Sequence, residues 1–334
     1  MSTQDNRVKT NPEAEELTEE NINEQRQIRR EKLKKLQEAG RDPYRHETWN
    51  VTAHSMDIKD NFDAMEDQEV SCAGRIMAFR RMGKMAFVDI QDKQGRIQCV
   101  VKKDDIGAEE YDWFKTYDIG DIIGVEGTIF RTKAGEISIQ VRNLALLSKS
   151  LQNKWHGLKD TDIRYRQRYM DLIVNPDVRE TFYKRAKIIH EIKRVLEEDY
   201  GFLEVDTPIL TTIAGGANAR PFNPHHNTLD IDMKLRISNE LYLKRLIVGG
   251  LDRVYEMGKM FRNEGMDRNH NPEFTSMECY MAYGNMESVM DVTEQVVYKA
   301  AMAVNGTPII SYQGKEFDVT PPWRRLDMTD AVKE

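Results

Sequence analysis

The stretch FRNEGMDRNHNPEFTSMECYMAY, residues 261 to 283, does most to decide the fold of this chain. It predicts two β-strands joined by a polar loop, because alternating residues flank a cluster of loop-forming ones. Every second side chain of a strand points to the same face. The packing face of the second strand is expected to carry Thr275, Met277, Cys279 and Met281. The opposite face is expected to carry Phe274, Ser276, Glu278 and Tyr280.

The first strand adds charge to this second face, because Arg262 and Glu264 are two residues apart and share a side. An arginine, an aromatic ring and carboxylates would then converge on one sheet surface. Such a surface suits a ligand with a phosphate, a planar base and a positive charge.

This hairpin resembles motif 2 of the class II aminoacyl-tRNA synthetases, which consists of an fRxE strand, a variable loop and a second strand. The segments RNEG, HNPEFT and MECYMAY are similar to those of the lysyl-tRNA synthetases, with Asn269 before His270 as the departure in the loop. The resemblance implies a lysine–tRNA ligase, which activates lysine with ATP as lysyl-adenylate and transfers it to tRNA(Lys).

The resemblance also implies a role for the polar residues around the hairpin. Arg262 would be the catalytic residue, bridging the lysine carboxylate and the α-phosphate of ATP, because both are anionic. ATP would be bound by Arg262, Glu264, His270, Asn271 and Phe274. Lysine would be bound by Gly216, Glu240, Arg262, Glu278 and Tyr280. A carboxylate at position 278 favours a substrate with a cationic side chain, whereas a pocket for aspartate would require a basic residue there.

Composition narrows the class of protein. The 334 residues are 40% hydrophobic and 31% charged, with a net charge of −7. This acidic balance argues against a protein coated in nucleic acid, but it does not exclude an RNA binder with localised basic residues. The three cysteines have no paired or CxxC spacing, so neither a disulfide framework nor a zinc site is indicated. With no apolar leader and no membrane-length apolar run, a cytoplasmic location is expected.

The N-terminal part is expected to be a disordered tail at 1–20, followed by a helix and connector at 21–67. Gly40 ends the predicted helix, which carries a concentrated set of basic residues: Arg26, Arg29, Arg30, Lys32, Lys34 and Lys35. A solvated helix face and an auxiliary RNA contact both remain open as interpretations of that set.

From residue 68 to residue 148 the hydrophobic period changes to two. Strands are expected at 70–80, 84–91, 96–102, 121–131 and 136–147, with a short helix at 105–117. Five strands with a helix after the third is the order of an OB-fold, a small β-barrel that binds oligonucleotides. The expected fold class is therefore α+β, with this barrel followed by part of an antiparallel-sheet catalytic domain.

Alternation along these strands turns a polar and aromatic set outward: Arg75 with Phe79, Phe87, Gln98 and Glu136. A lone exposed phenylalanine is an ordinary surface feature. Together, however, an aromatic ring, an amide and an arginine can stack a base, read its edge and hold a phosphate. The arrangement resembles the anticodon-binding domain of the lysyl-, aspartyl- and asparaginyl-tRNA synthetases. It implies that Phe87 stacks on the central uridine, that Gln98 reads its edge, and that Glu136 contacts a further base.

Residues 149–177 are expected to form an inter-domain linker and residues 178–334 part of a catalytic domain. The helix predicted at 178–200 has a broad apolar face that needs a second surface to cover it. That surface is either the monomer core or, as a resemblance to motif 1 of the class implies and as we favour, the partner in a homodimer. Ser238 or Asn239 is expected to cap a helix at 240–248.

Motif 3 of the class, a glycine-rich GxGxDR element, does not occur in this sequence. No residue present is therefore assigned as a ligand for the Mg²⁺ that accompanies ATP, and those ligands are expected C-terminal to residue 334. The chain is interpreted as a lysine–tRNA ligase that is truncated at its C-terminus. The alternative is a catalytically inactive tRNA-binding fragment or paralogue that uses the OB-fold.

Overall fold

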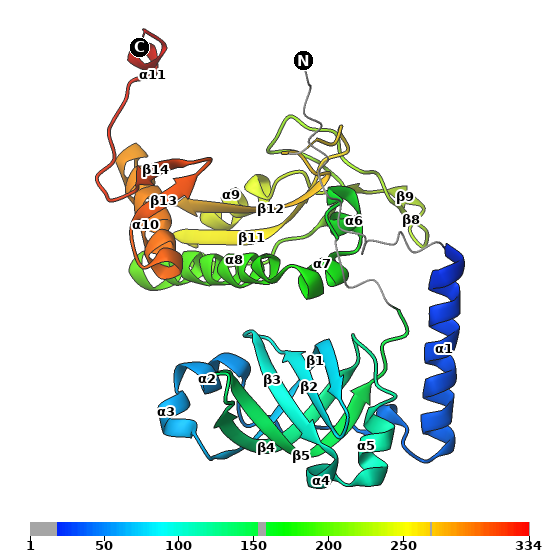
Figure 1. Ribbon diagram of the computed structural model, residues 1–334. Coiled ribbons are helices and arrows are strands. Elements are labelled where there is room, and N and C mark those ends of the chain that lie inside the picture. The colour runs from blue at the N-terminus through cyan, green and yellow to red at the C-terminus, as the bar shows by residue number, and fades with distance from the viewer. Residues whose placement is uncertain (1–18, 153–157, 268, 334) are drawn as a thin grey trace, which may run out of the picture. The chain divides into compact units, whose positions relative to one another are not determined.

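The computed structural model describes residues 19–152, 158–267 and 269–333 (Figure 1). The chain divides into two compact units, Met1–Pro176 and Asp177–Glu334. Residues 1–18 of the tail expected at 1–20 lie outside the described residues. The first described element is helix α1, which spans Glu19–Glu38.

Five strands of the first unit close into a barrel in the order β1-β2-β3-β5-β4. Their bounds are β1 Glu69–Met82, β2 Met85–Gln91, β3 Arg96–Lys102, β4 Ile122–Arg131 and β5 Ile137–Ser148. Strands β3 and β5 pair in parallel, and the other neighbours pair antiparallel. The OB-fold expected from the sequence is therefore confirmed, with each strand close to its predicted bounds.

The helix expected between the third and fourth strands is interrupted. It consists of α4, Lys103–Ile106, and α5, Ala108–Phe114. Gly107 separates them with φ of 90°, a backbone conformation that glycine adopts without a steric penalty and that ends a right-handed helix.

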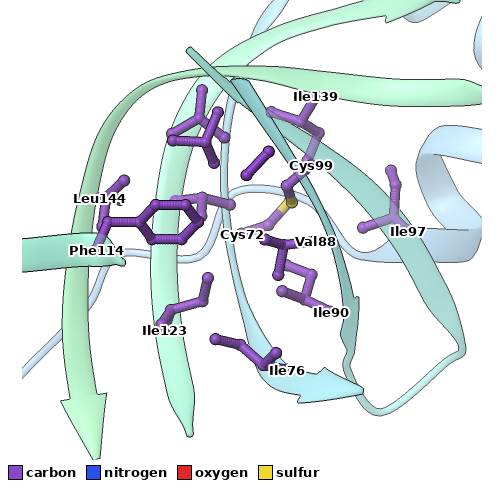
Figure 2. Packing of buried hydrophobic residues seen from close by; sticks show 14 of the residues in the cluster. Cys72, Ile76, Val88, Ile90, Ile97, Cys99, Phe114, Ile123, Ile139 and Leu144 are labelled. Atoms are coloured by element: carbon purple, nitrogen blue, oxygen red, sulfur yellow. The ribbon is translucent and has the colours of Figure 1, made fainter. Parts of the chain in front are cut away.

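The interior of the barrel is filled by aliphatic and sulfur-containing side chains from all five strands (Figure 2). The inward positions alternate as expected, with Ile76, Val88 and Ile139 fully buried. Phe79, which was expected to point outward, instead packs against this core with its ring centroid 4.9 Å from that of Phe114. The expectation was wrong because the β1–β2 register shifts between Ile76 and Ala78, and such a bulge moves later side chains to the other face.

Two residues of the basic set on α1 fasten this helix to the barrel. Arg29 is 6% exposed and donates hydrogen bonds to the carbonyl oxygens of Ile119 and Ser150. Lys32 Nζ lies 2.6 Å from Asp118 Oδ1. The remaining helices of the first unit are α2 Ser55–Asp60, α3 Phe62–Met65, α6 Thr161–Arg166 and α7 Arg168–Val174, with the 3-10 turn η1 at Pro43–Arg45.

The second unit is built on a three-stranded sheet in the order β12-β11-β6. Strands β11, Arg253–Phe261, and β12, Glu273–Met281, form an antiparallel hairpin, while the short β6, Leu203–Glu204, runs parallel to β11. The predicted helix at 178–200 is α8, Pro176–Arg194, continued by a π-helical turn at Val195–Asp199.

One face of this sheet packs against that turn and against α10, Met286–Asn305, to form a small core. Met277, Cys279 and Met281 lie on this face, as the alternation of the second strand predicted. Helix α9, Glu240–Val248, has the predicted bounds and lies against β11 and β12.

Short two-stranded sheets and one helix complete the second unit. Their elements are β7 Leu210–Thr211 with β10 Lys234–Leu235, β8 His225–His226 with β9 Ile231–Asp232, β13 Ile309–Tyr312 with β14 Lys315–Asp318, and α11 Met328–Lys333. No helix in the described part of the chain has the length and apolar character needed to cross a membrane.

Candidate functional site

The charged end of the hairpin begins where β11 stops. Strand β11 ends at Phe261, so Arg262 and Glu264 follow the strand rather than belonging to it, contrary to the expectation. Arg262 nevertheless keeps one strand-like bond, because its N–H donates to the carbonyl oxygen of Pro272 at 2.8 Å. Glu264 Oε1 accepts from the N–H of Arg220 at 3.2 Å. The backbone of Arg262 and the side chain of Glu264 are therefore each held by a backbone group of the loops at this end of the sheet.

The guanidinium of Arg262 lies over an aromatic ring, as the predicted site requires. Its Cζ atom is 5.0 Å from the centroid of Phe274, a cation–π contact across the hairpin. Its Nε atom is buried and has no hydrogen-bond partner among the described residues. Burying a donor on a cation without a partner is costly, so this guanidinium is suited to an anionic ligand.

The predicted amino-acid pocket is brought together around Glu278. Ser238 Oγ donates to Glu278 Oε1 at 2.9 Å, and the hydroxyl of Tyr280 donates to Oε2 at 3.2 Å. Burial and the negative charges of Glu278 and Glu240 raise the pKa of Tyr280 well above its usual range. Tyr280 is therefore neutral at pH 7 and retains the proton that it donates.

Gly216 stands next to this pocket with φ of 85°. A Cβ atom added at Gly216 would lie 2.9 Å from Cβ of Glu240, closer than side chains pack. Only a residue without a side chain allows this approach, so the predicted grouping of Gly216 with Glu240 is present in the structure.

Lys244 is a neighbour of this pocket that the sequence analysis did not single out. Its Nζ atom lies 2.6 Å from Glu240 Oε1 and 5.9 Å from the ring centroid of Tyr280. The spacing of four residues between Glu240 and Lys244 on a helix was the available signal.

The remaining predicted ATP ligands lie in the loop of the hairpin. His270 is exposed and its Nδ1 atom is 2.8 Å from Asp267 Oδ2. Hydrogen bonds from the N–H of Asn269 and from the His270 side chain lower the pKa of Asp267. Asn271 is also exposed.

A buried polar network supports the site from behind. Arg236 and Glu256 are each 3% exposed and form an ion pair. Arg236 also donates to the carbonyl oxygens of Lys259 and Thr207, at 2.9 and 3.0 Å. A Cβ atom added at Gly258 would lie 2.3 Å from Arg236 Nη2, so this glycine makes room for the guanidinium. The network ties β11 to the segment that leads into α9.

The second predicted site is a groove of about 930 Å³ on the barrel. It is lined by Phe87, Gln98 and Glu136, three of the four residues expected to contact an anticodon. Ser138 Oγ lies 3.1 Å from Gln98 Oε1, and Lys59 Nζ lies 3.5 Å from Glu136 Oε1. The ring and both polar groups are therefore available on one concave surface.

The fourth predicted residue, Arg75, does not line this groove. Its guanidinium donates to the carbonyl oxygen of Gly120 at 2.7 Å, and burial lowers its pKa. The arginines that line the groove are Arg80 and Arg96. Arg80 pairs with Phe87 across β1 and β2 and lies 5.9 Å from its ring centroid. Simple alternation missed Arg80 because of the register shift after Ile76.

The described residues contain no group of three or more histidine, cysteine or acidic side chains placed to hold a metal ion. No ligand for Mg²⁺ is therefore assigned among the described residues.

Two protein families match this chain. The family described as tRNA synthetases class II (D, K and N) matches residues 160–334, and the OB-fold nucleic acid binding domain matches residues 70–147. The first match covers the hairpin and its pocket, and the second covers the barrel and its groove.

Similar curated proteins carry the name lysine–tRNA ligase. One from Thermoanaerobacter sp. (strain X514) is 58% identical over 318 residues, which are 94% of this chain and 64% of that protein. One from Clostridium perfringens (strain SM101 / Type A) is 53% identical, over 95% of this chain and 64% of that protein. One from Clostridium botulinum (strain Langeland / NCTC 10281 / Type F) is 54% identical, over 95% and 63%. The chain thus spans about 64% of the length of these relatives.

Proposed function

The chain belongs to the class II tRNA synthetases of the D, K and N group, and from this premise we propose that it is part of a lysine–tRNA ligase. The observation that carries the choice of lysine is the carboxylate of Glu278. It is held by two hydroxyl donors on the sheet face that also carries Phe274. A fixed carboxylate beside Glu240 and Tyr280 suits a substrate that brings a cationic side chain.

In the proposed reaction the carboxylate of lysine attacks the α-phosphate of ATP. The bond between the α- and β-phosphates breaks, pyrophosphate leaves, and lysyl-adenylate forms. Arg262 would lie between the two anionic reactants and stabilise the charge that builds on the phosphoryl oxygens. Its buried Nε atom, which has no partner among the described residues, supports this role. No protein nucleophile is required.

The other predicted ligands have supporting roles in the proposal. Phe274 would stack on the adenine, and Glu264 would accept from its amino group. His270 and Asn271 would contact the phosphates or the tRNA end. Gly216 and Glu240 would bind the α-amino group of lysine. Magnesium belongs to the proposed activity as the usual companion of ATP, but we assign it to no described residue.

In the second step, a hydroxyl of the terminal ribose of tRNA(Lys) would attack the carbonyl carbon of the adenylate, and AMP would leave. Residues 68–148 would recognise the anticodon. Phe87, Gln98, Glu136 and an arginine would contact the bases and phosphates. Arg75 is the arginine expected from sequence, whereas Arg80 and Arg96 line the groove. The linker 149–177 would lead into the catalytic residues 178–334. We expect the protein to act in the cytoplasm, where its tRNA is charged.

We further propose that α8 lies at a homodimer interface. No residue of α8 is fully buried, although the helix carries Phe182, Tyr183 and Ile188, which are 46%, 61% and 36% exposed. Large apolar side chains gathered on one exposed helix favour burial against a partner. Sedimentation of the full-length protein tests this, because Phe182→Asp should shift it from dimer to monomer.

The test of the function is amino-acid-dependent exchange of pyrophosphate into ATP by the full-length protein. Lysine is expected to support exchange, and Glu278→Gln is expected to raise the KM for lysine far more than the KM for ATP. Preference for aspartate or asparagine would contradict the assignment.

The barrel supports one competing function, binding of tRNA without amino-acid activation, because its groove is complete within the first unit. In that case the full-length protein would bind tRNA in a Phe87-dependent manner and catalyse no exchange with any amino acid. The two measurements together separate an enzyme from a tRNA-binding paralogue.

A further inference from the structure

Ser238 connects the carboxylate of Glu278 to the backbone of Glu240 in the proposed lysine pocket. Its Oγ atom accepts a hydrogen bond from the N–H of Glu240 at 3.1 Å and donates one to Glu278 Oε1 at 2.9 Å. The direction of each bond is fixed, because a backbone N–H only donates and a carboxylate only accepts. The single hydroxyl proton is therefore directed at Glu278.

The position of this hydroxyl is confined on its other side by Gly216. A Cβ atom added at Gly216 would lie 2.8 Å from Ser238 Oγ and 3.1 Å from Ser238 Cβ. The neighbouring Asn239 is fully buried, and its Nδ2 atom lies 3.3 Å from Glu256 Oε2 in the polar network behind the site. The backbone at Ser238 is thus fixed from both directions.

The two donors on Glu278 come from different parts of the fold. Tyr280 is on the same strand, so its bond at 3.2 Å to Oε2 moves with β12. Ser238 precedes α9, so its bond joins β12 to the start of that helix. Each carboxylate oxygen can still accept a second hydrogen bond, which leaves room for a substrate ammonium.

We propose that Ser238 is a positioning residue that sets the affinity for the cationic substrate by holding the carboxylate of Glu278 toward it. This inference rests on the proposed function, in which Glu278 receives the side-chain ammonium of lysine. Ser238 contributes no charge to the pocket. It acts by limiting the rotation of a charged group, so that less conformational entropy is lost when lysine binds.

The test is Ser238→Ala in the full-length protein, with initial rates of lysine-dependent pyrophosphate exchange. Removal of a hydrogen bond to a charged group is expected to raise the KM for lysine about tenfold. The KM for ATP should change less than twofold, because the hydrogen bonds of Ser238 go to Glu278 and Glu240, which are assigned to lysine. The matched control is Ser311→Ala on the exposed strand β13, which should change neither constant.

A double-mutant cycle distinguishes positioning from a general packing defect. Glu278→Asp keeps the charge but withdraws the carboxylate from Ser238 by about one bond length. In that background Ser238→Ala should change the KM for lysine less than twofold, because the contact is already lost. The proposal would be overturned if Ser238→Ala changed the KM for lysine by the same factor in the wild-type and Glu278→Asp proteins. An unchanged KM for lysine in Ser238→Ala alone would also overturn it. Failure of the wild-type protein to use lysine would instead refute the proposed function itself.

Discussion

The barrel and the catalytic unit place their functional residues by different means. In the barrel, Phe87 and Gln98 lie on strands of a closed sheet whose inward positions are almost all buried. In the catalytic unit, Glu278 and Tyr280 also lie on a strand, but Arg262 and Ser238 lie outside strands and helices, at the ends of elements. A closed sheet needs only side-chain packing to fix its outward face, whereas loops need specific polar contacts.

The two interiors differ in the same way. The barrel core consists of apolar residues from every strand (Figure 2). The core of the catalytic unit is a smaller apolar cluster, and beside it the ion pair of Arg236 and Glu256 is buried. Apolar burial tolerates volume-conserving substitution, but a buried charge depends on one partner.

The largest expected effect is therefore loss of that partner. Arg236→Ala would leave Glu256 buried without its cation and should destabilise the catalytic unit by about 3 to 5 kcal/mol. The loss of stability is measured by urea unfolding, with hydrogen exchange of the β11 amides as the readout. Lys193→Ala removes a half-exposed pair with Glu204 and should cost about 1 kcal/mol or less. Equal effects would mean that the buried network does not hold the site.

The corresponding change in the barrel is Ile139→Ala. Ile139 is fully buried on β5, so removing its side chain should destabilise the barrel by about 2 to 5 kcal/mol. Urea unfolding monitored by the far-ultraviolet signal measures the change. Ile28→Ala on α1 is the control, because Ile28 is 45% exposed and should cost well under about 1 kcal/mol. Equal destabilisation by Ile139→Ala and Ile28→Ala would contradict the description of a closed core.

A smaller effect is expected on the outward face of the barrel. Phe87→Ala should weaken binding of an anticodon stem-loop RNA by about 1 to 3 kcal/mol, the usual contribution of one stacked base. Fluorescence titration at fixed salt measures this without a loss of stability. Arg80→Gln and Arg75→Gln form a matched pair in the same assay. We expect the larger loss at Arg80, since Arg75 donates to Gly120; the reverse order would restore Arg75 as the RNA ligand.

A pH-dependent effect concerns the cysteines and alkaline conditions. Burial raises the pKa of the Cys72 thiol to about 12, whereas the pKa of an ordinary thiol is about 9. Between these values the unfolded chain loses the proton while the folded barrel keeps it. Stability is therefore unaffected below pH 9 and falls as pH rises, by about 1.4 kcal/mol per pH unit for one such thiol.

Alkylation at pH 8 compares the two units through the same chemistry. Only the thiolate reacts, so the 1% exposed Cys72 should be modified no faster than the barrel unfolds. Cys279 is partly exposed and should react first. Faster labelling of Cys72 would show that the barrel opens more readily than the catalytic unit.

The sequence predicted the elements whose pattern is local. Alternation predicted the faces of β12 and the bounds of the barrel strands, because each outward or inward choice depends only on the preceding residue. It failed at Phe79 and at Arg80, since the register shift after Ile76 arises from pairing with β2. A bulge is a property of two strands, and one strand does not reveal it.

The first strand of the hairpin shows the same limit in the catalytic unit. Strand β11 begins at Arg253, but Glu256 and Gly258 interrupt its apolar pattern. Both residues are explained by Arg236, which pairs with the first and occupies the space left by the second. That partner precedes the strand by more than fifteen residues, so no local pattern indicated it.

By itself, the sequence determined the barrel, the family and most of the residues that the two sites bring together, because these follow from periodicity and from contiguous motifs. Only the tertiary structure decided that Arg80 rather than Arg75 lines the groove, and that Ser238 donates to Glu278. These choices depend on contacts between segments distant in the chain, where hydrogen-bond direction and close approach, rather than local pattern, select the residue.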